Sequence, residues 1–526
     1  GLHSYDVIPE PDTFSAIHVN VVNSDSVWGV AAPMFELDWV AEPAYFVGNG
    51  PLLDNKGNLY FSPQFYHGER VVLVSLDGQT GERRWTLPAD NEIQASSPAF
   101  ILNDPDNPGS QIIYIVGYNR VMALRPDGST LWSQATGLSP LGSDLSDKAK
   151  IKFHSLNYHP ATDSLVSITK AGALFAFSRK TGELIAAIGQ IPGAPAISGK
   201  GTKIPKFILN KVDPLMDKAF GKTDEGLSLF SSAVNYIYGG GGVVTNFFSI
   251  DPDTSRIYMA ATAPDEEDGT EDGRSELGAI YALDLVDDDS GGLQFQVLNR
   301  KTFQGGTGST PALSADGHRL YVSDNEGHVI ALDSELAEIW RVDVGEPLVG
   351  SITVAADNNE LYAVTAKDVI QIIDKGDHGT RTWTAELTGF DGYANVDEQS
   401  NALTATVTAN GVVIMIGGGK SLLGRTLMLH MGMGLLDRET GKLRYFAEGR
   451  EDSLAMSVVA ADGSIYVAHS PLRRAAGKAM YPELTPDLTG GIARFKPIRL
   501  DLLVRDAICA AAARGANAST LDETTE

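Results

Sequence analysis

The chain has 526 residues, of which 41 are Lys or Arg and 67 are Asp or Glu, so its formal net charge is −26. This acidic balance excludes nucleic acid and anionic membrane surfaces as expected partners. The single cysteine, Cys509, excludes an internal disulfide and a cysteine-based zinc site. No apolar run approaches the ~18 residues of a spanning helix, so we expect a soluble protein without a membrane span.

The first 34 residues form an extension before the regular pattern begins. Pro9 and Pro11 interrupt any early element. Residues 14–22, FSAIHVNVV, alternate between apolar and other residues and predict one strand.

A repeated hairpin is the main signal of the chain. Residues 72–85, VLVSLDGQTGERRW, predict a strand, a turn at Asp77, Gly78 and Gly81, and a second strand that carries Trp85. Degenerate copies start near residues 121, 174, 280, 329, 369 and 434. The spacing of the tryptophans matches the ~40–50 residues of a four-stranded propeller blade. The repeat therefore predicts a closed ring of blades.

Counting the repeats predicts an all-β, eight-bladed β-propeller with four-stranded antiparallel blades over residues 35–499. Seven whole blades cover residues 46–87, 95–135, 152–189, 230–299, 307–345, 348–387 and 400–448. We expect residues 35–42 to complete the eighth blade with three strands from residues 454–495. This N-terminal strand then closes the last blade and leaves no open sheet edge.

Insertions and the C-terminus depart from the repeat. We expect insertions at about 190–229, 264–276 and 470–489, where loops on a rigid scaffold carry function. Residues 500–526 predict a short C-terminal helix followed by a loose acidic tail.

The run 417–421, GGGKS, is interpreted as a hairpin turn. We interpret the recurring tryptophans as wedges between blades, namely Trp39, Trp85, Trp132, Trp340 and Trp383.

Polar residues at the entries of the inner strands are candidates for an axial ligand site, because inner strands converge on the channel. Four glycines after Tyr238 also bring backbone amides close to any ligand there. Packing in a narrow channel, or a simple bend, explains the same residues structurally. The predicted ligand-binding set is Lys152, His154, Asn235, Tyr238, Gly240, Thr307, Ser351 and Asn401, with Asn49 at an equivalent entry.

The acidic loop at 265–273 offers one candidate catalytic group. Asp272 is a possible general base if burial raises its pKa, and a solvated turn residue otherwise. The loop does not match the calcium-binding loop pattern, because Ala279 stands where a bidentate Glu is required. We predict no metal ligand from spacing alone.

The repeat A-L-D-x-x-T-G-x-x-x-W resembles that of the quinoprotein alcohol dehydrogenase family over residues 35–495. The resemblance implies an eight-bladed propeller, pyrroloquinoline quinone (PQQ) and calcium on the central axis, and oxidoreductase chemistry. It also implies a periplasmic or extracellular protein whose signal peptide has been removed. Quinone-free proteins share the repeat, namely the outer-membrane assembly scaffold and tetrathionate hydrolases.

Blade four resembles the family's cofactor segment, with departures at its cofactor residues. The calcium-ligating Asn of the family falls at Ala263, and its catalytic Asp falls near Asp272. The vicinal cysteine pair is absent, and Tyr238 is the aromatic nearest to the glycine run.

Three functions therefore stay open from the sequence. The first is a quinoprotein-like enzyme or binding protein with an axial small-molecule site. The second is a hydrolase without a cofactor, in which Asp272 assists water, and the third is a scaffold that binds a protein partner.

Overall fold

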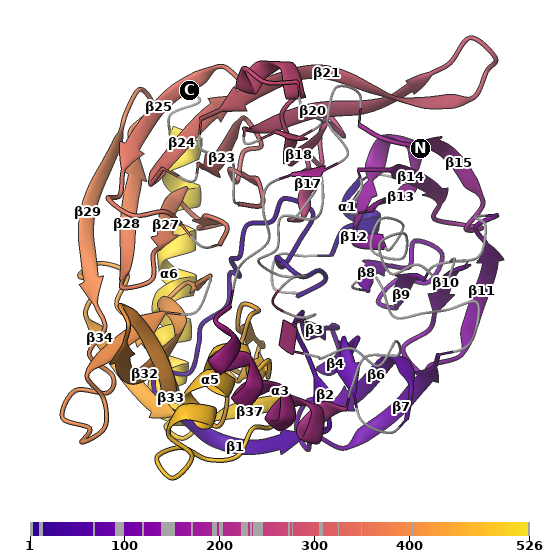
Figure 1. The fold of residues 1–526 in the computed structure, drawn as a ribbon. Coiled ribbons are helices and arrows are strands. Elements are labelled where there is room, and N and C mark those ends of the chain that lie inside the picture. The colour runs from indigo at the N-terminus through magenta and orange to yellow at the C-terminus, as the bar shows by residue number, and fades with distance from the viewer. Residues whose placement is uncertain are drawn as a thin grey trace.

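The computed structural model describes residues 4–9, 14–66, 69–89, 99–117, 120–137, 153–169, 172–191, 197–198, 204–221, 230–231, 234, 246–271, 274–275, 277–304, 309–324, 326–348, 350–401 and 404–523. Its strands form eight antiparallel blades around a ring (Figure 1). Blade 7 carries a fifth strand, β30 (Glu398–Asn401), and the other seven blades have four. The all-β, eight-bladed fold predicted from the repeats is confirmed.

The strands of each blade follow one another from the channel outward, except in the composite blade. Blade 1 consists of β3 (Leu52–Leu53), β4 (Asn58–Phe61), β6 (Val71–Asp77) and β7 (Arg83–Pro88), and blade 2 consists of β8 (Phe100–Asn103), β9 (Gln111–Val116), β10 (Arg120–Leu124) and β11 (Thr130–Ala135). Blade 3 consists of β12 (Phe153–His159), β13 (Ser164–Thr169), β14 (Leu174–Ser178) and β15 (Leu184–Ile188), and blade 4 consists of β17 (Phe248–Ile250), β18 (Ile257–Thr262), β20 (Gly278–Asp287) and β21 (Leu293–Phe303). Blade 5 consists of β22 (Ala312–Leu313), β23 (Arg319–Ser323), β24 (His328–Asp333) and β25 (Glu338–Asp343), and blade 6 consists of β26 (Thr353–Val354), β27 (Glu360–Val364), β28 (Asp368–Asp374) and β29 (Gly379–Glu386). Blade 7 consists of β31 (Thr406–Thr408), β32 (Gly411–Leu422), β33 (Arg425–Leu436) and β34 (Leu443–Glu448), in addition to β30.

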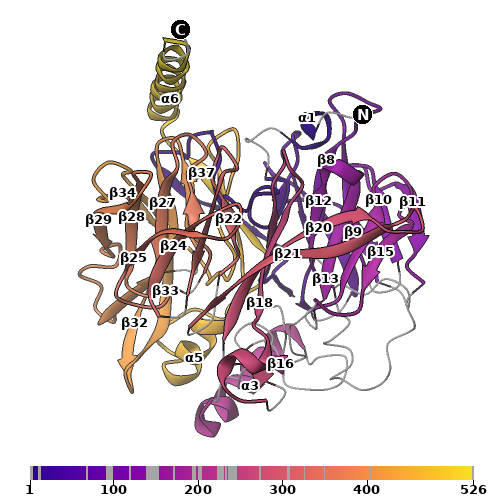
Figure 2. The same ribbon diagram turned by 90° about the horizontal axis from the view of Figure 1, so that it is seen from above.

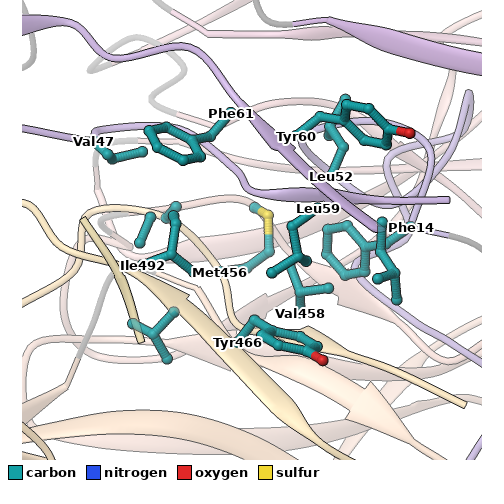
Figure 3. Packing of buried hydrophobic residues seen from close by; sticks show 14 of the residues in the cluster. Phe14, Val47, Leu52, Leu59, Tyr60, Phe61, Met456, Val458, Tyr466 and Ile492 are labelled. Atoms are coloured by element: carbon teal, nitrogen blue, oxygen red, sulfur yellow. The ribbon is translucent and has the colours of Figure 1, made fainter. Parts of the chain in front are cut away.

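Blade 8 joins the two ends of the propeller. It consists of β35 (Val458–Val459), β36 (Ile465–Ala468), β37 (Ile492–Pro497) and β1 (Phe35–Ala41). Strand β1 pairs antiparallel with β37, from Phe35 opposite Pro497 to Ala41 opposite Ile492. The predicted closure by an N-terminal strand is confirmed. Buried side chains of blades 8 and 1, including Val458, Tyr466 and Leu59, pack together at this junction (Figure 3).

Tryptophans anchor neighbouring blades as the sequence predicts. Each of the five lies against a glycine in the outer hairpin of the next blade, so closely that a Cβ atom on that glycine would clash with the ring. The pairs are Trp39 with Gly81, Trp85 with Gly128, Trp132 with Gly182, Trp340 with Gly379 and Trp383 with Gly441.

The N-terminal residues 14–32, here called the belt, run around the inside of the ring (Figure 1). Belt carbonyl groups accept hydrogen bonds from inner-strand amides, blade after blade in chain order. The amide donors are Leu53, Ile101, Ile250, Leu313, Val354 and Val407, at 2.8–3.1 Å from the carbonyls of Phe14, Ser15, Val21, Val22, Ser24 and Asp25. The Asn157 side chain of blade 3 also donates to the Val21 carbonyl, at 3.0 Å. The Ala32 amide donates to the Gly463 carbonyl of blade 8.

The belt corrects the expectation of a strand at residues 14–22. Phe14, Ala16 and Val19 make isolated bridges, and Val19, Asn23 and Asp25 adopt positive φ. The chain turns there because its carbonyl groups bond to separate blades instead of to one neighbouring strand. Most belt side chains are nevertheless buried, the polar Ser15 and His18 among them.

Helices lie at the two ends of the ring. Helices α3 (Lys206–Phe220) and α5 (Leu472–Met480) lie at one end, the α5 face, and helix α6 (Leu500–Glu523) lies at the other, the α6 face (Figure 2). None of the described helices has the length and apolarity needed to cross a membrane. The remaining elements are α1 (Ser4–Val7), η1 (Pro160–Thr162), η2 (Asp265–Asp268), and the two-stranded pairs β2 (Tyr45–Phe46) with β5 (Phe65–Tyr66) and β16 (Ile197–Ser198) with β19 (Arg274–Ser275).

Two further expectations are corrected. Residues 417–421 do not form a turn, because they lie within β32 and pair with β30 and β33; the turn follows at Leu423 and Gly424. Helix α6 continues to Glu523, so most of the acidic tail that we expected to be loose is helical.

Candidate functional site

The centre of the ring holds a buried polar cluster built on the belt. His18 Nδ1 lies 2.7 Å from Asp25 Oδ1, and both side chains are buried. Ser351 Oγ donates to Asp25 Oδ2 at 2.8 Å, and Thr310 Oγ1 lies 3.5 Å from His18 Nε2. The Phe247 ring packs edge-on against the imidazole, with 5.1 Å between centroids.

This cluster has the order carboxylate, imidazole, hydroxyl that activates nucleophiles in hydrolytic enzymes. Its hydrogen bonds, however, connect the belt to blades 5 and 6. The contact to Thr310 is also longer than a normal hydrogen bond between such groups. The cluster therefore fixes the belt within the ring.

Two small chambers lie beside the belt. One is lined by His18, Asn20, Ser155 and Asn157, and the other by Asn49, Ser62 and Gln64. Each encloses about 10 Å³, which is room for about one water molecule. Within the described residues, the hydroxyl groups of Ser155 and Ser62 are buried without a hydrogen-bond partner.

The structure describes the side chains of two residues in the predicted ligand-binding set, Ser351 and Asn401. Ser351 binds Asp25 of the belt. Asn401 donates from Nδ2 to the carbonyl groups of Thr365 and Asp368, both at 3.0 Å, and so connects blade 7 to blade 6. The Asn401 carbonyl accepts a 2.6 Å hydrogen bond from Arg473. Both side chains thus make structural contacts.

For the remaining predicted site residues, the structure does not describe the side chains. The backbone of His154 lies in β12. The others lie outside the described residues, and their roles stay predictions; they are Lys152, Asn235, Tyr238, Gly240, Thr307 and the candidate base Asp272.

The described part of blade 4 lacks the calcium ligand of the family. Ala263, at the position of the family's calcium-ligating Asn, is fully buried, and its amide donates to the Leu277 carbonyl at 3.0 Å. Its methyl group offers no ligand atom to a hard cation. In the acidic loop, Glu267 pairs with Arg300 and Thr302 of β21. The only cysteine, Cys509, is exposed on α6, far along the chain from blade 4.

A group with metal-ligand chemistry occurs in blade 5, which spacing along the sequence did not indicate. Asp324, Glu326 and His328 place ligand atoms within 4.8 Å of one another. Asp324 Oδ1 accepts from the amides of Glu326 and His328 and thereby caps the turn. Asp54 caps the equivalent turn of blade 1 in the same way, so a structural role explains the blade 5 group.

Helix α5 is attached by buried ion pairs. Arg474 and Glu451 form a bidentate pair at 2.6 and 2.7 Å, and Arg473 and Asp452 form a second pair at 2.7 and 2.9 Å.

Nearby, His469 is fully buried and contacts the Gly490 carbonyl at 3.0 Å through Nδ1. Burial lowers the pKa of His469 to about 4. The imidazole is therefore neutral at pH 7.

A groove of ligand size lies between blades 6 and 7, near the α5 face. Its volume is about 460 Å³. Leu387, Phe390 and Val396 supply apolar surface. The carboxylates that line it are Asp368, Glu386, Asp391, Asp397 and Glu398.

Charge within this groove is unevenly compensated. Burial, together with the carboxylates of Glu346 and Glu386, raises the pKa of Asp368. Lys420 Nζ lies 3.9 Å from Asp397, and Lys367 lines the groove. Within the lining, five carboxylates thus stand against one amine, that of Lys367, and a cation or a basic side chain is the complementary ligand.

Eight blades, with a tryptophan of one blade packed on a glycine of the next, define a propeller of the PQQ-like repeat class. The chain belongs to the family whose model is described as "Outer membrane protein assembly factor BamB", which matches residues 24–199 and 262–471. No curated protein sequence matches the chain.

Solved structures with the same fold are distant in sequence. The chain is similar to the quinohemoprotein alcohol dehydrogenase from Comamonas testosteroni, at 13% identity, covering 92% of this chain and 80% of that one, with a TM-score of 0.55. It is also similar to a europium-containing methanol dehydrogenase, at 12% identity, 93% and 98% coverage and a TM-score of 0.53. At these identities the likeness shows the fold alone.

Proposed function

We propose that this protein is a binding propeller without quinone chemistry, and that it holds a segment of a partner protein in the groove between blades 6 and 7. Cavity size carries the proposal. The groove of about 460 Å³ is in the range of ligand sites, whereas each axial chamber next to the belt has room for about one water.

The lining of the groove indicates the chemistry of the partner. A segment with Lys or Arg beside an apolar side chain would place its cation among the carboxylates and its apolar group against Leu387 and Val396. The description of the matched family as an outer-membrane assembly factor supports a protein as partner. It also supports export to a periplasmic or extracellular compartment, which cell fractionation would test.

Binding of a probe peptide of alternating lysine and leucine would test the groove, measured by fluorescence anisotropy. The double variant Glu386→Gln/Asp397→Asn should weaken binding about tenfold, because two carboxylates at ~1 kcal/mol or less each are removed. Added salt should weaken the wild-type interaction. The matched control is Glu483→Gln/Asp289→Asn, which removes two exposed carboxylates elsewhere. Equal weakening in both variants, or in neither, would reject the groove as the site.

A second candidate function keeps a small-molecule site on the axis, as in an oxidoreductase-related enzyme. The unpartnered Ser155 hydroxyl beside Asn157 and His18 favours it, because a polar ligand would satisfy that group. Adding PQQ and calcium while recording absorption and thermal melting separates the candidates. We expect neither a new absorption band nor a melting shift, and either change would favour the axial site.

A further inference from the structure

We propose that helix α3 of a second copy of this chain occupies the groove between blades 6 and 7, so that two copies pair through their α5 faces. This inference rests on the proposed function, because it names the partner whose segment the groove holds. A stripe along α3 carries it. Phe207, Lys211, Pro214 and Lys218 recur every three or four residues and therefore share one side of the helix.

The stripe points away from the propeller, because the opposite side of α3 is packed. Val212, Met216 and Phe220 are buried in a cluster with residues of α5. Since successive helical residues are about 100° apart, Met216 lies about 200° around the axis from Pro214. All four stripe residues are exposed, and Phe207 is 48% exposed. The stripe is thus the side of α3 that can meet a partner.

The charges of the stripe are not compensated by the helix that carries it. Among the described residues, neither Lys211 nor Lys218 has an ion-pair partner. The two carboxylates of α3 belong to Asp213 and Asp217, which directly precede stripe residues and so lie about 100° around the axis from them. The stripe therefore presents two ammonium groups and one phenyl ring.

This is the chemistry that complements the groove. The groove offers five carboxylates together with the apolar side chains of Leu387 and Val396. The ammonium groups of the stripe would lie among the carboxylates, and the Phe207 ring would lie against the apolar part of the lining. On a chain with a net charge of −26, the basic stripe and the acidic groove are thus two complementary surfaces of the same molecule.

The stripe and the groove lie at the same end of the ring. Helix α3 packs beside α5, and Gly477 of α5 lies against the Met428 carbonyl of β33 in blade 7 (Figure 1). The groove follows between blades 7 and 6. Two copies whose α5 faces meet can therefore exchange helices, with α3 of each in the groove of the other. The same contact then forms twice and closes a two-fold dimer.

Sedimentation equilibrium of the full chain tests the pairing. We expect a dimer in the wild type. Lys211→Glu/Lys218→Glu should weaken dimerisation about tenfold, because the new carboxylates meet those of the groove. Its melting temperature should not change, since both side chains are exposed.

The matched control is Lys56→Glu/Lys442→Glu, which makes the same change of charge at exposed lysines in turns of blades 1 and 7. This control should dimerise like the wild type. A monomeric wild type, or equal dimerisation of the two double variants, would overturn the proposal.

A mixture of two variants tests whether α3 and the groove are the two sides of one contact. Lys211→Glu/Lys218→Glu keeps an intact groove, and Glu386→Gln/Asp397→Asn keeps an intact α3. A mixed dimer contains one wild-type contact, whereas each variant alone contains none. We expect the mixed dimer to form more tightly than either homodimer, measured by fluorescence anisotropy with one variant labelled. A mixed dimer no tighter than the homodimers would overturn the assignment of α3 to the groove.

The probe peptide of alternating lysine and leucine separates this inference from the proposed function. It should bind the Lys211→Glu/Lys218→Glu variant, whose groove is intact, and it should dissociate the wild-type dimer. Peptide binding to a wild type that is monomeric would overturn the second copy as partner and would support the groove as a site. Dimers that the peptide does not dissociate would overturn the pairing through the groove.

Discussion

At the residue scale, contact between a tryptophan and a glycine sets the distance between blades. Trp340 is 6% exposed, lies against Gly379 of blade 6, and donates from its indole to Asp374 at 3.1 Å. Asp374 also accepts hydrogen bonds from Arg319 and Tyr321. One indole ring thus connects two blades through packing and through a shared carboxylate.

Removal of this ring should destabilise the propeller strongly. Trp340→Ala leaves a cavity between blades 5 and 6 and should lower the free energy of unfolding by about 3–5 kcal/mol. Urea denaturation would measure the loss. Leu423→Ala is the control, because that side chain is 78% exposed and its removal leaves no cavity. A Trp340→Ala transition that coincides with the wild type would show that the ring is not a wedge.

His469 should make stability depend on pH. Its pKa is about 4 in the folded protein and about 6.5 when unfolded, so the unfolded chain binds the additional proton between these values. The contribution of His469 to stability is complete above about pH 6.5, and falls by about 3 kcal/mol as the pH drops to 4.

A variant isolates this contribution. His469→Asn keeps an N–H group for the Gly490 carbonyl and cannot titrate, so its unfolding free energy should fall less between pH 6.5 and 4 than that of the wild type. Chemical denaturation across this range provides the comparison. Parallel pH profiles would show that His469 is not the titrating group.

At the element scale, the repeats predicted the blades because each hairpin signal is local in sequence. The Asp-Gly turns and the tryptophan spacing lie within single blades, and β1 was recognisable as the missing strand of blade 8. The belt was not predictable in this way. Its carbonyl groups bond to seven blades that are distant in sequence, and no local pattern encodes such contacts.

The belt also explains why the axial site was only partly predictable. Polar entries of the inner strands were candidates for an axial ligand site, with packing in a narrow channel as the structural alternative. Ser351 instead binds Asp25 of the belt, and Asn401 binds the turn between β27 and β28. The groove was missed because its lining comes from turns of two blades whose contact no sequence spacing reveals.

Anchoring of the belt should contribute measurably to stability. Asp25→Ala removes a buried carboxylate and leaves His18 and Ser351 without their partner, which should cost about 3 kcal/mol. Thermal melting would show the loss. Asp289→Ala, in an exposed turn of blade 4, should melt like the wild type. Equal melting of both variants would exclude a structural role for the cluster.

At the scale of the whole molecule, two N-terminal segments hold the ring closed. Strand β1 completes blade 8 from the N-terminal side, and the belt joins the inner strands from within. The fold of a quinoprotein dehydrogenase is thus combined with a channel that holds the chain's own N-terminal residues. The binding surface that we propose is therefore the groove between blades 6 and 7.

A crystal structure of the protein grown with PQQ and calcium tests this account most directly. We predict density for residues 14–32 inside the ring, with Asp25 between His18 and Ser351, and no density for quinone on the axis. Quinone density in the channel, or a belt displaced from the ring, would contradict the account.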